Sequence, residues 1–144
     1  FVPPYADRVA NLEKKVLAGA RFIQTQFCFD LGPFVDFMRE VRRRGLHRRA
    51  HIIVGVGTLK SAKALAWMVR HVPGVQVPSP LLARLEGARD PQREARRICV
   101  ETIDALAQIE GVAGFHLMGH RNEDTLADII AECDLRRRPR LHTV

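Results

Sequence analysis

The apolar positions along the chain alternate between the spacing typical of helices and the spacing typical of strands. From residue 6 to residue 18 they recur three or four positions apart, which predicts a helix that Gly19 ends. The same spacing predicts helices over residues 33–44, 59–71, 91–110 and 123–133, and a short helix between Pro80 and Gly87. These helices are separated by three segments of a different pattern.

Those three segments predict β-strands. Residues 21–27 alternate, with Phe22, Gln24 and Gln26 on one face. Residues 50–56 are an almost continuous apolar run, which is typical of a parallel strand covered by helices, and residues 112–118 form the third strand. Helices and strands that alternate in this way predict an α/β fold with parallel strands and right-handed crossovers.

Single residues refine this outline. Asp90 before Pro91 predicts a capped helix start, and Thr58 is the expected cap of the helix over residues 59–71. The segment from Gly55 to Thr58 is interpreted as a tight turn, with a phosphate cradle as the alternative. Val69 is expected to face inward from the helix over residues 59–71, and Trp67 is expected to cover helix-packing surface. The predicted buried faces of the last two long helices are Ala95, Ile98, Cys99, Thr102, Leu106 and Ile109 in one, and Leu126, Ile129 and Ile130 in the other.

Composition fits one ordinary globular domain. The 144 residues carry a net charge of +7, much of it in arginine runs at residues 42–44, 48–49 and 136–140. Because no aromatic residues interleave these runs and each follows a helix, solvated surface is the preferred interpretation and nucleic-acid binding the weaker alternative. No apolar run is long enough to span a bilayer, and the start lacks the pattern of a signal peptide. A cytoplasmic location is therefore expected.

The number and spacing of the cysteines argue against disulfides and against a zinc site. Cys28, Cys99 and Cys133 lie far apart and are odd in number, which fits free thiols in a reducing compartment. No pair of cysteines has the spacing of zinc ligands, so no metal is expected. The strand over residues 21–27 is the stronger candidate for a site, because Gln24 and Gln26 need partners or a ligand if they are buried. The alternative is that one or both are solvated at a strand end.

An ordered set of motifs resembles the methylenetetrahydrofolate reductase family. It begins with Lys14-Lys15-Val16, Ala18-Gly-Ala20 and Gln24-Thr-Gln-Phe-Cys-Phe-Asp30, continues with Ile52-Ile-Val-Gly-Val56 and Val75-Gln-Val-Pro78, and ends with Gly111-Val-x-Gly-Phe-His116 and Arg121. The resemblance covers roughly residues 9–133. It implies that residues 1–133 are the C-terminal half of a (β/α)8 TIM barrel. Residues 134–144 are basic and contain one proline, and they are expected to be a flexible tail.

The resemblance also implies a reaction. Family members pass a hydride from reduced nicotinamide, NAD(P)H, through FAD to methylenetetrahydrofolate, in one-carbon metabolism and methionine biosynthesis. The acidic catalytic residues of the family belong to the N-terminal half of the barrel, so no catalytic residue is assigned in this chain. The implied partners are the folate substrate and a complementary N-terminal half-barrel in the same or another chain, with a homo-oligomer as a further option. The chain lacks an initiator methionine, and a fragment or processed piece is expected.

Four residues carry implied roles. Gln26 matches a glutamine that reaches the flavin and the pterin, and a side-chain amide offers both a donor and an acceptor to such a ring edge. Lys15 matches a lysine on the phosphate side of the flavin, and Gln24 stands where the family has an aliphatic residue that touches the flavin. Arg121 matches an arginine near the folate. Departures such as Gln24 leave two alternatives open, a non-catalytic assembly or regulatory subunit and a divergent reductase that works without flavin.

Overall fold

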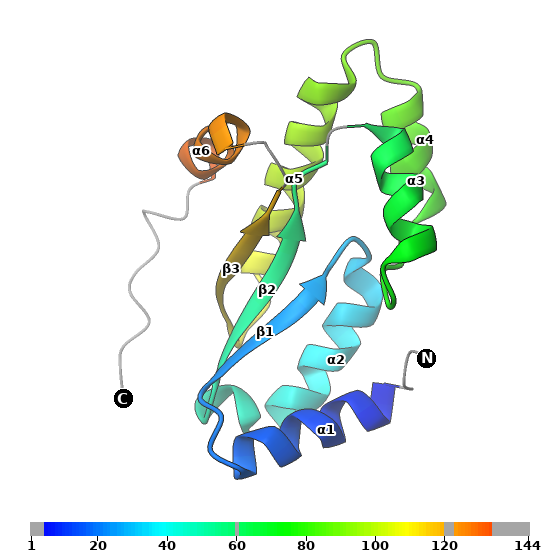
Figure 1. Ribbon diagram of the computed structural model, residues 1–144. Coiled ribbons are helices and arrows are strands. Elements are labelled where there is room, and N and C mark those ends of the chain that lie inside the picture. Colours follow the sequence, from blue (N-terminus) through cyan, green and yellow to red (C-terminus); the bar gives the residue numbers. More distant parts are fainter. Residues whose placement is uncertain (1–4, 60, 120–122, 134–144) are drawn as a thin grey trace.

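Three parallel strands form the centre of the molecule (Figure 1). The computed structural model describes residues 5–59, 61–119 and 123–133. The strands, in the spatial order β1-β2-β3, are β1 (Phe22–Phe27), β2 (His51–Gly57) and β3 (Val112–Met118). The helices are α1 (Tyr5–Leu17), α2 (Leu31–Arg43), α3 (Ala62–His71), α4 (Ser79–Glu86), α5 (Pro91–Ala107) and α6 (Glu123–Glu132), and a 3₁₀ turn, η1 (Leu46–Arg48), follows α2. The predicted α/β class, element order and parallel pairing are confirmed. The arrangement is consistent with part of a TIM barrel, and the predicted tail lies outside the described residues.

Side-chain caps fix where the helices begin. The Oδ1 atom of Asp90 accepts the N–H of Arg93 at 3.1 Å, which confirms the predicted start of α5. The expected cap of α3 was wrong. Ser61 caps that helix by accepting the N–H of Ala64 at 3.2 Å. Thr58 has a different role, because its N–H and its hydroxyl both donate to the carbonyl of Met118, at 2.9 and 3.3 Å.

The two glycines of β2 allow close packing and do not form a turn. The predicted turn at Gly55 to Thr58 was wrong, because β2 continues through Gly57 and pairs there with Met118. A Cβ atom on Gly57 would lie 2.9 Å from the ring of Phe27 and 3.0 Å from the ring of Phe29. The absence of a side chain at Gly57 therefore leaves room for the stacked pair Phe27–Phe29, whose ring centroids are 6.0 Å apart.

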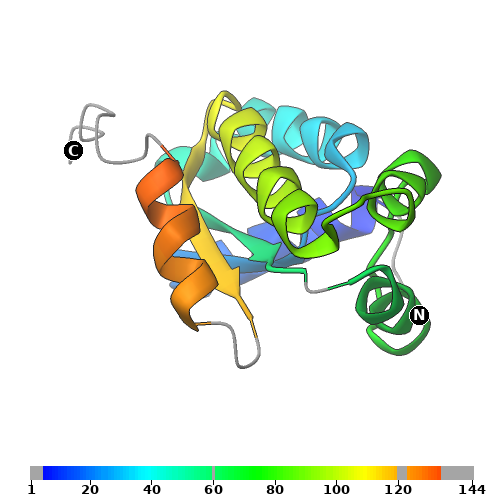
Figure 2. The same ribbon diagram turned by 90° about the horizontal axis from the view of Figure 1, so that it is seen from above.

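One face of the sheet is covered by helices. Figure 2 shows α2 and α5 side by side over this face. The strand β2 buries Ile52, Val54 and Val56 against them, each at most 1% exposed. This cluster also includes Val9, Leu12 and Val16 of α1, Met38 and Val41 of α2, Ile103 and Leu106 of α5, and Ile129 of α6. A second cluster joins α3, α4 and the first half of α5 through Phe29, Leu59, Leu65, Val75, Leu85, Ala95 and Ile98.

The opposite face of the sheet is open within the described residues. Phe22 is 62% exposed, and Gln24, Gln26, His51 and His116 are exposed as well. The strands β1 and β3 each pair only with β2, so both outer edges of the described sheet are unpaired. Parallel sheets are normally covered on both faces. Within the described residues, this face of the sheet therefore has no covering layer.

The outer side of α3 is more exposed than its sequence suggests. Leu65 is fully buried, but Trp67 is 57% exposed and Val69 is 45% exposed. The predictions that Val69 faces inward and that Trp67 covers helix-packing surface were wrong, because α3 packs on its neighbours mainly through the side that carries Leu65. The indole of Trp67 stacks instead on the imidazole of His71, with ring centroids 4.6 Å apart.

Candidate functional site

A β-bulge shapes the carboxyl end of β1. Gln24 pairs with Ile53 and Phe27 pairs with Gly55, so β1 holds one more residue than β2 across this step. The hydroxyl of Thr25 bridges the gap by accepting the N–H of Gly55 at 3.1 Å and donating to the carbonyl of Gln26 at 2.9 Å. Bulges of this kind often lie next to functional sites, because they redirect a side chain. Here the residue that follows Thr25 is Gln26.

The side-chain amide of Gln26 is bonded to the backbone through its oxygen, and its N–H groups are available to a ligand. Its Oε1 atom accepts the N–H of Phe27 at 3.1 Å. Its Nε2 group has no hydrogen-bond partner among the described residues, and the side chain is exposed. An amide whose acceptor is already bonded to the backbone presents its N–H donors to a ligand. Gln26 is therefore a pre-oriented donor at the rim of the sheet.

A cavity of about 350 Å³ adjoins Gln26. Arg8 of α1 and Asp30, the cap of α2, bring polar groups to it, and Phe34 and Phe37 of α2 bring aromatic ones. The carboxylate of Asp30 accepts the N–H of Gly32 at 3.1 Å, which fixes its position. The cavity thus combines flat apolar walls with a few polar groups, as small-molecule sites commonly do.

A larger, mostly apolar cavity of about 710 Å³ lies at the carboxyl ends of β2 and β3. Phe27 lines both cavities, so the two adjoin at the end of β1. Leu59, Met68 and Met118 form much of the larger cavity's apolar wall. Ligands of open and closed parallel sheets bind at the carboxyl ends of the strands. The region around Gln26 and Phe27, which includes both cavities, is the candidate site.

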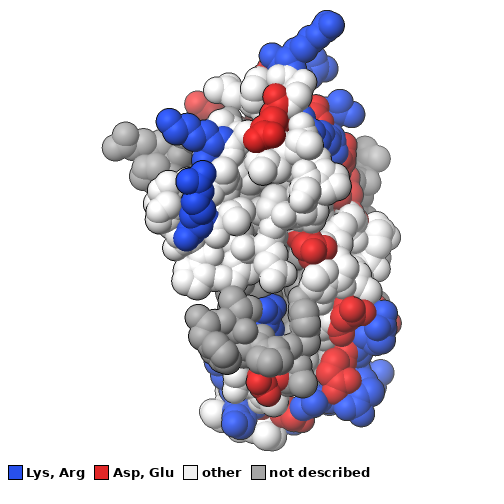
Figure 3. All heavy atoms as spheres, turned by 90° about the vertical axis from the view of Figure 1, so that its right-hand side faces the viewer, with Lys and Arg blue, Asp and Glu red and all other residues white. Residues whose placement is uncertain are grey.

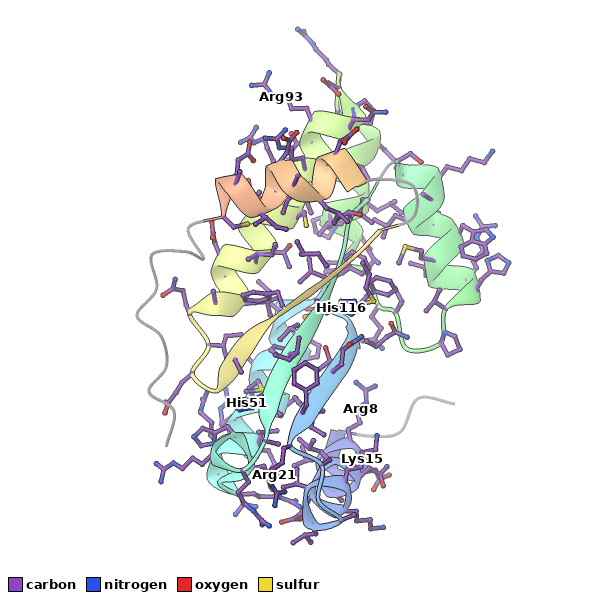
Figure 4. The ribbon with its side chains drawn as sticks, turned by 60° about the vertical axis from the view of Figure 1, so that its left-hand side comes forward. Arg8, Lys15, Arg21, His51, Arg93 and His116 are labelled. Carbon is purple, nitrogen blue, oxygen red and sulfur yellow. The ribbon has the colours of Figure 1, made fainter. Side chains whose placement is uncertain are left out.

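The predicted site residues do not all meet there. Gln24 and Gln26 share the open face of β1. Lys15 is in the last turn of α1, which leads into the opposite, amino end of β1, and Figure 4 shows it near Arg21. Arg121 lies outside the described residues. The structure therefore brings the two glutamines together and keeps Lys15 apart from them.

Two residues of the site were not predicted from the sequence. Strict alternation assigns Thr25 and Phe27 to the helix-covered face of β1. The bulge brings the Thr25 hydroxyl to the neighbouring strand and the Phe27 ring to the rim between the cavities. A threonine directly before an amide at a strand end was the available signal, but alternation alone does not locate a bulge.

The first arginine run forms ion pairs on the surface. Arg43 and Arg44 both bind Glu40, and Arg44 also binds Glu13 at 2.7 Å. Hydrogen bonds from Arg43 and Arg44 lower the pKa of Glu40 to about 2. These contacts support the interpretation of residues 42–44 as a charged helix end. The run at residues 136–140 lies outside the described residues.

Cys28, which lines the smaller cavity, is expected to make the stability of the fold depend on pH in the alkaline range. Its thiol is buried, and this burial, followed by the nearby Asp30 carboxylate, raises its pKa to about 12. Burial also raises the pKa of Cys99 to about 12. The folded state thus favours both neutral thiols, whereas the unfolded chain ionises them near pH 9.

The stability contributed by these thiols is fully present below about pH 9 and is lost as the pH rises toward 12. We expect the free energy of unfolding to fall by up to about 1.4 kcal/mol per pH unit for each cysteine in this range. Urea denaturation at several pH values measures it. Cys28→Ala should flatten the slope, and an unchanged slope in Cys28→Ala would contradict the assignment.

Metal and membrane features are not evident in the described part of the chain. Across residues 5–59, 61–119 and 123–133, no group of three His, Cys, Asp or Glu side chains could hold a metal ion. In the same ranges, no helix is both long enough and apolar enough to cross a bilayer.

Comparison with known proteins gives consistent matches. A family model described as methylenetetrahydrofolate reductase matches residues 3–134. The chain is 32% identical over 132 residues to "Methylenetetrahydrofolate reductase 2" of Schizosaccharomyces pombe, which covers 86% of the chain and 20% of that relative. It is 26% identical over 116 residues to "Methylenetetrahydrofolate reductase (NADH) 1" of Arabidopsis thaliana, which covers 78% of the chain and 19% of that relative. The chain thus spans about one fifth of the length of these relatives.

Proposed function

Because the chain belongs to the methylenetetrahydrofolate reductase family, we propose that it is the part of a (β/α)8 reductase barrel that presents Gln26 to folate and flavin. The observation that carries this proposal is the position of Gln26. It lies at the carboxyl end of a parallel strand, on the open face of the sheet, with its N–H donors unused among the described residues. In barrel enzymes this end of the strands is where substrates bind.

The proposed reaction is hydride transfer from reduced nicotinamide to methylenetetrahydrofolate in the cytoplasm, as part of one-carbon metabolism and methionine biosynthesis. The name of the Arabidopsis relative includes NADH, which supports a reduced nicotinamide as the donor. FAD, when bound, would supply the hydride relay, and the protein would supply position and electrostatics. The chain's own tasks are to orient ring edges through Gln26 and to keep water away through Phe27.

The residues present fit a flavin ring and a pterin better than they fit a phosphate. The free donors of Gln26 suit the polar edge of either ring. Gln24 lies on the same face and can extend this polar strip toward the amino end of β1. Lys15 lies near the amino end of β1, at the opposite end of this strand from Gln26, so we assign it only a long-range attraction to phosphate groups. The substrate role of Arg121 rests on the resemblance.

The rest of the barrel is the proposed partner. Among residues 5–59, 61–119 and 123–133 the sheet has one open face and two unpaired edges, which favours a covering structure, and Phe22 exposes a large apolar ring on that face. Strands supplied by an N-terminal half-barrel would pair with β1 or β3 and bury this ring. The family's acidic catalytic residues would come from that half.

Replacement of Gln26 by alanine tests the proposed function. In the barrel assembled from this chain and a family N-terminal half, we expect Gln26→Ala to lower kcat/KM for methylenetetrahydrofolate at least about tenfold, because one hydrogen bond is lost. The measurement is folate-dependent oxidation of NADH. The control is Gln108→Ala, since Gln108 is exposed at the end of α5, away from both cavities. An assembled barrel with no turnover and no bound flavin would refute the proposal, and equal loss in both variants would remove Gln26 from the site.

A further inference from the structure

The buried sides of α5 and α6 each carry a cysteine. Cys99 of α5 is 2% exposed, and Cys133, which directly follows α6, is 3% exposed. Both belong to the cluster that contains Ile103 of α5 and Ile129 of α6. Each cysteine is one helical turn from the isoleucine of its own helix, and the N–H of Cys133 donates to the carbonyl of Ile129 at 2.9 Å. The two thiols therefore point into the same part of the core.

Ion pairs join α5 to α6 beside these cysteines (Figure 1 and Figure 2). Arg96, one turn before Cys99, binds Asp128 at 2.8 Å. It also binds Glu132, the residue before Cys133. Burial and, after it, the nearby Cys133 raise the pKa of the Cys99 thiol, so the two thiols are close enough to influence each other. The contacts between the helices thus place two cysteines of distant sequence next to one another.

Contacts on the other side of α5 fix the position of Cys99. Arg84 of α4 binds Glu94 of α5, and it binds Glu101 at 2.6 Å. In Figure 3, basic and acidic side chains lie next to one another at the top of the molecule, the end at which α4 is followed by α5. Because α5 is held by α4, the sheet and α6, the last turn of α6 is the part that can open most easily beside the two thiols.

We propose that Cys99 and Cys133 form a reversible disulfide that locks α6 to α5 when the oxidised form of a small thiol, such as glutathione, accumulates. The structure holds the reduced form, in which both residues are thiols. Their burial explains how both persist as thiols in a reducing compartment, because buried neutral thiols react slowly. The lock goes beyond the proposed function, since it requires no folate, flavin or nicotinamide.

The bond forms by two exchange steps. Opening of the last turn of α6 exposes Cys133, whose thiolate attacks one sulfur of oxidised glutathione, forms a mixed disulfide and releases one glutathione thiolate. As α6 closes, Cys99 attacks the sulfur of Cys133, forms the bond between the two helices and releases the second glutathione. Two protein thiols are oxidised, one glutathione disulfide is reduced to two thiols, and the two protons pass from the cysteines to the glutathiones.

The first test identifies which cysteines pair in the full chain. The chain is equilibrated with oxidised glutathione, its remaining thiols are alkylated in denaturant, and tryptic peptides are mapped by mass spectrometry without reduction. Trypsin places the three cysteines in separate peptides. We expect the Cys99 and Cys133 peptides to be linked with loss of two hydrogens, and Cys28 to be alkylated. Cys28 is the matched internal control, because it is also buried and its pKa is also raised to about 12.

Three outcomes of this mapping would refute the proposal. They are a bond from Cys28 to either of the other cysteines, glutathione attached to single cysteines without a protein disulfide, and a chain that keeps all of its thiols at equilibrium. The mapping needs no substitution, so it does not depend on whether a variant folds.

A second measurement shows whether the fold itself favours the bond. Cys99 and Cys133 are the nearest cysteines along the chain, so the unfolded chain also prefers to pair them. The disulfide fraction is therefore measured against the square of reduced glutathione divided by oxidised glutathione, with and without urea. We expect the midpoint to be at least about tenfold higher for the folded chain, because the bond and the folded state stabilise each other. An equal or lower midpoint would show that the two helices oppose the bond.

The melting temperature tests the lock. We expect the oxidised chain to have a Tm about 5–10 °C above that of the reduced chain, because the bond closes the loop over residues 99–133. Cys28→Ala should keep this rise, and Cys99→Ala should lose it under the same treatment with glutathione. An oxidised chain that carries the bond but melts at the same or a lower temperature would overturn the lock.

Discussion

Ile103→Ala is expected to lower the free energy of unfolding by about 2–5 kcal/mol. Ile103 lies in the second half of α5 and is fully buried in the cluster that joins this helix to the sheet. Removing three carbon atoms from a closely packed site loses apolar burial and leaves a cavity that the neighbouring residues fill only partly. Because α5 supports β2 and β3 from behind, we also expect weaker ligand binding in proportion to the unfolded fraction.

The measurement for Ile103→Ala is urea denaturation followed by circular dichroism. The matched control is Ile130→Ala, since Ile130 is also on a helix but is 41% exposed. We expect the control to cost less than about 1 kcal/mol. Equal losses in the two variants would show that α5 does not pack on the sheet as described.

The contrast between Ile103 and Ile130 shows where helical spacing stops predicting burial. Ile98, Leu106 and Ile129 were predicted to face inward and are buried. Ile130 was predicted to face inward but is 41% exposed, whereas Ile103 was not assigned to the buried face. Spacing locates the centre of an apolar face, but its width depends on how many neighbours a helix has. The helix α5 lies between the sheet, α4 and α6, so its buried face is wide, and α6 is at the margin of the described structure.

The candidate site was predictable to a similar extent. Two amides in one strand singled out Gln24 and Gln26, on the reasoning that a buried amide needs a partner. Both side chains are exposed, which is the alternative that the sequence left open, and the resemblance alone distinguished Gln26 from Gln24. The bulge at Thr25 depends on the register between β1 and β2, which one strand's sequence does not contain. The cavity beside Trp67 depends on which side of α3 meets α4, and that choice is made by tertiary packing. The spacing of apolar and polar residues therefore predicts the strand that carries the site, and tertiary packing determines which side chains line its cavities.

Gly55→Ala is the second substitution with a large expected effect. A Cβ atom at this position would lie 2.6 Å from the methyl group of Met118, and 2.8 and 2.9 Å from the carbonyl oxygens of Thr25 and Gln26. The methionine can move, but the carbonyls belong to the bulge. We expect the free energy of unfolding to fall by about 1–3 kcal/mol, and Gln26 to lose its orientation because the added methyl group displaces the backbone that holds it.

Denaturation and ligand titration together measure the effect of Gly55→Ala. Gly32→Ala is the control, because its Cβ would meet only Asp30, at 3.6 Å, in the first turn of α2, where alanine favours the helix. The double variant Gly55→Ala/Met118→Ala separates the two causes. In this double variant the new methyl group no longer meets Met118 but still meets the two carbonyls. We therefore expect Gly55→Ala to lower the free energy of unfolding less in the Met118→Ala background than in the original chain, but not to lose its effect. Full recovery would mean that the bulge can shift freely, and the orientation of Gln26 would then need another explanation than its backbone.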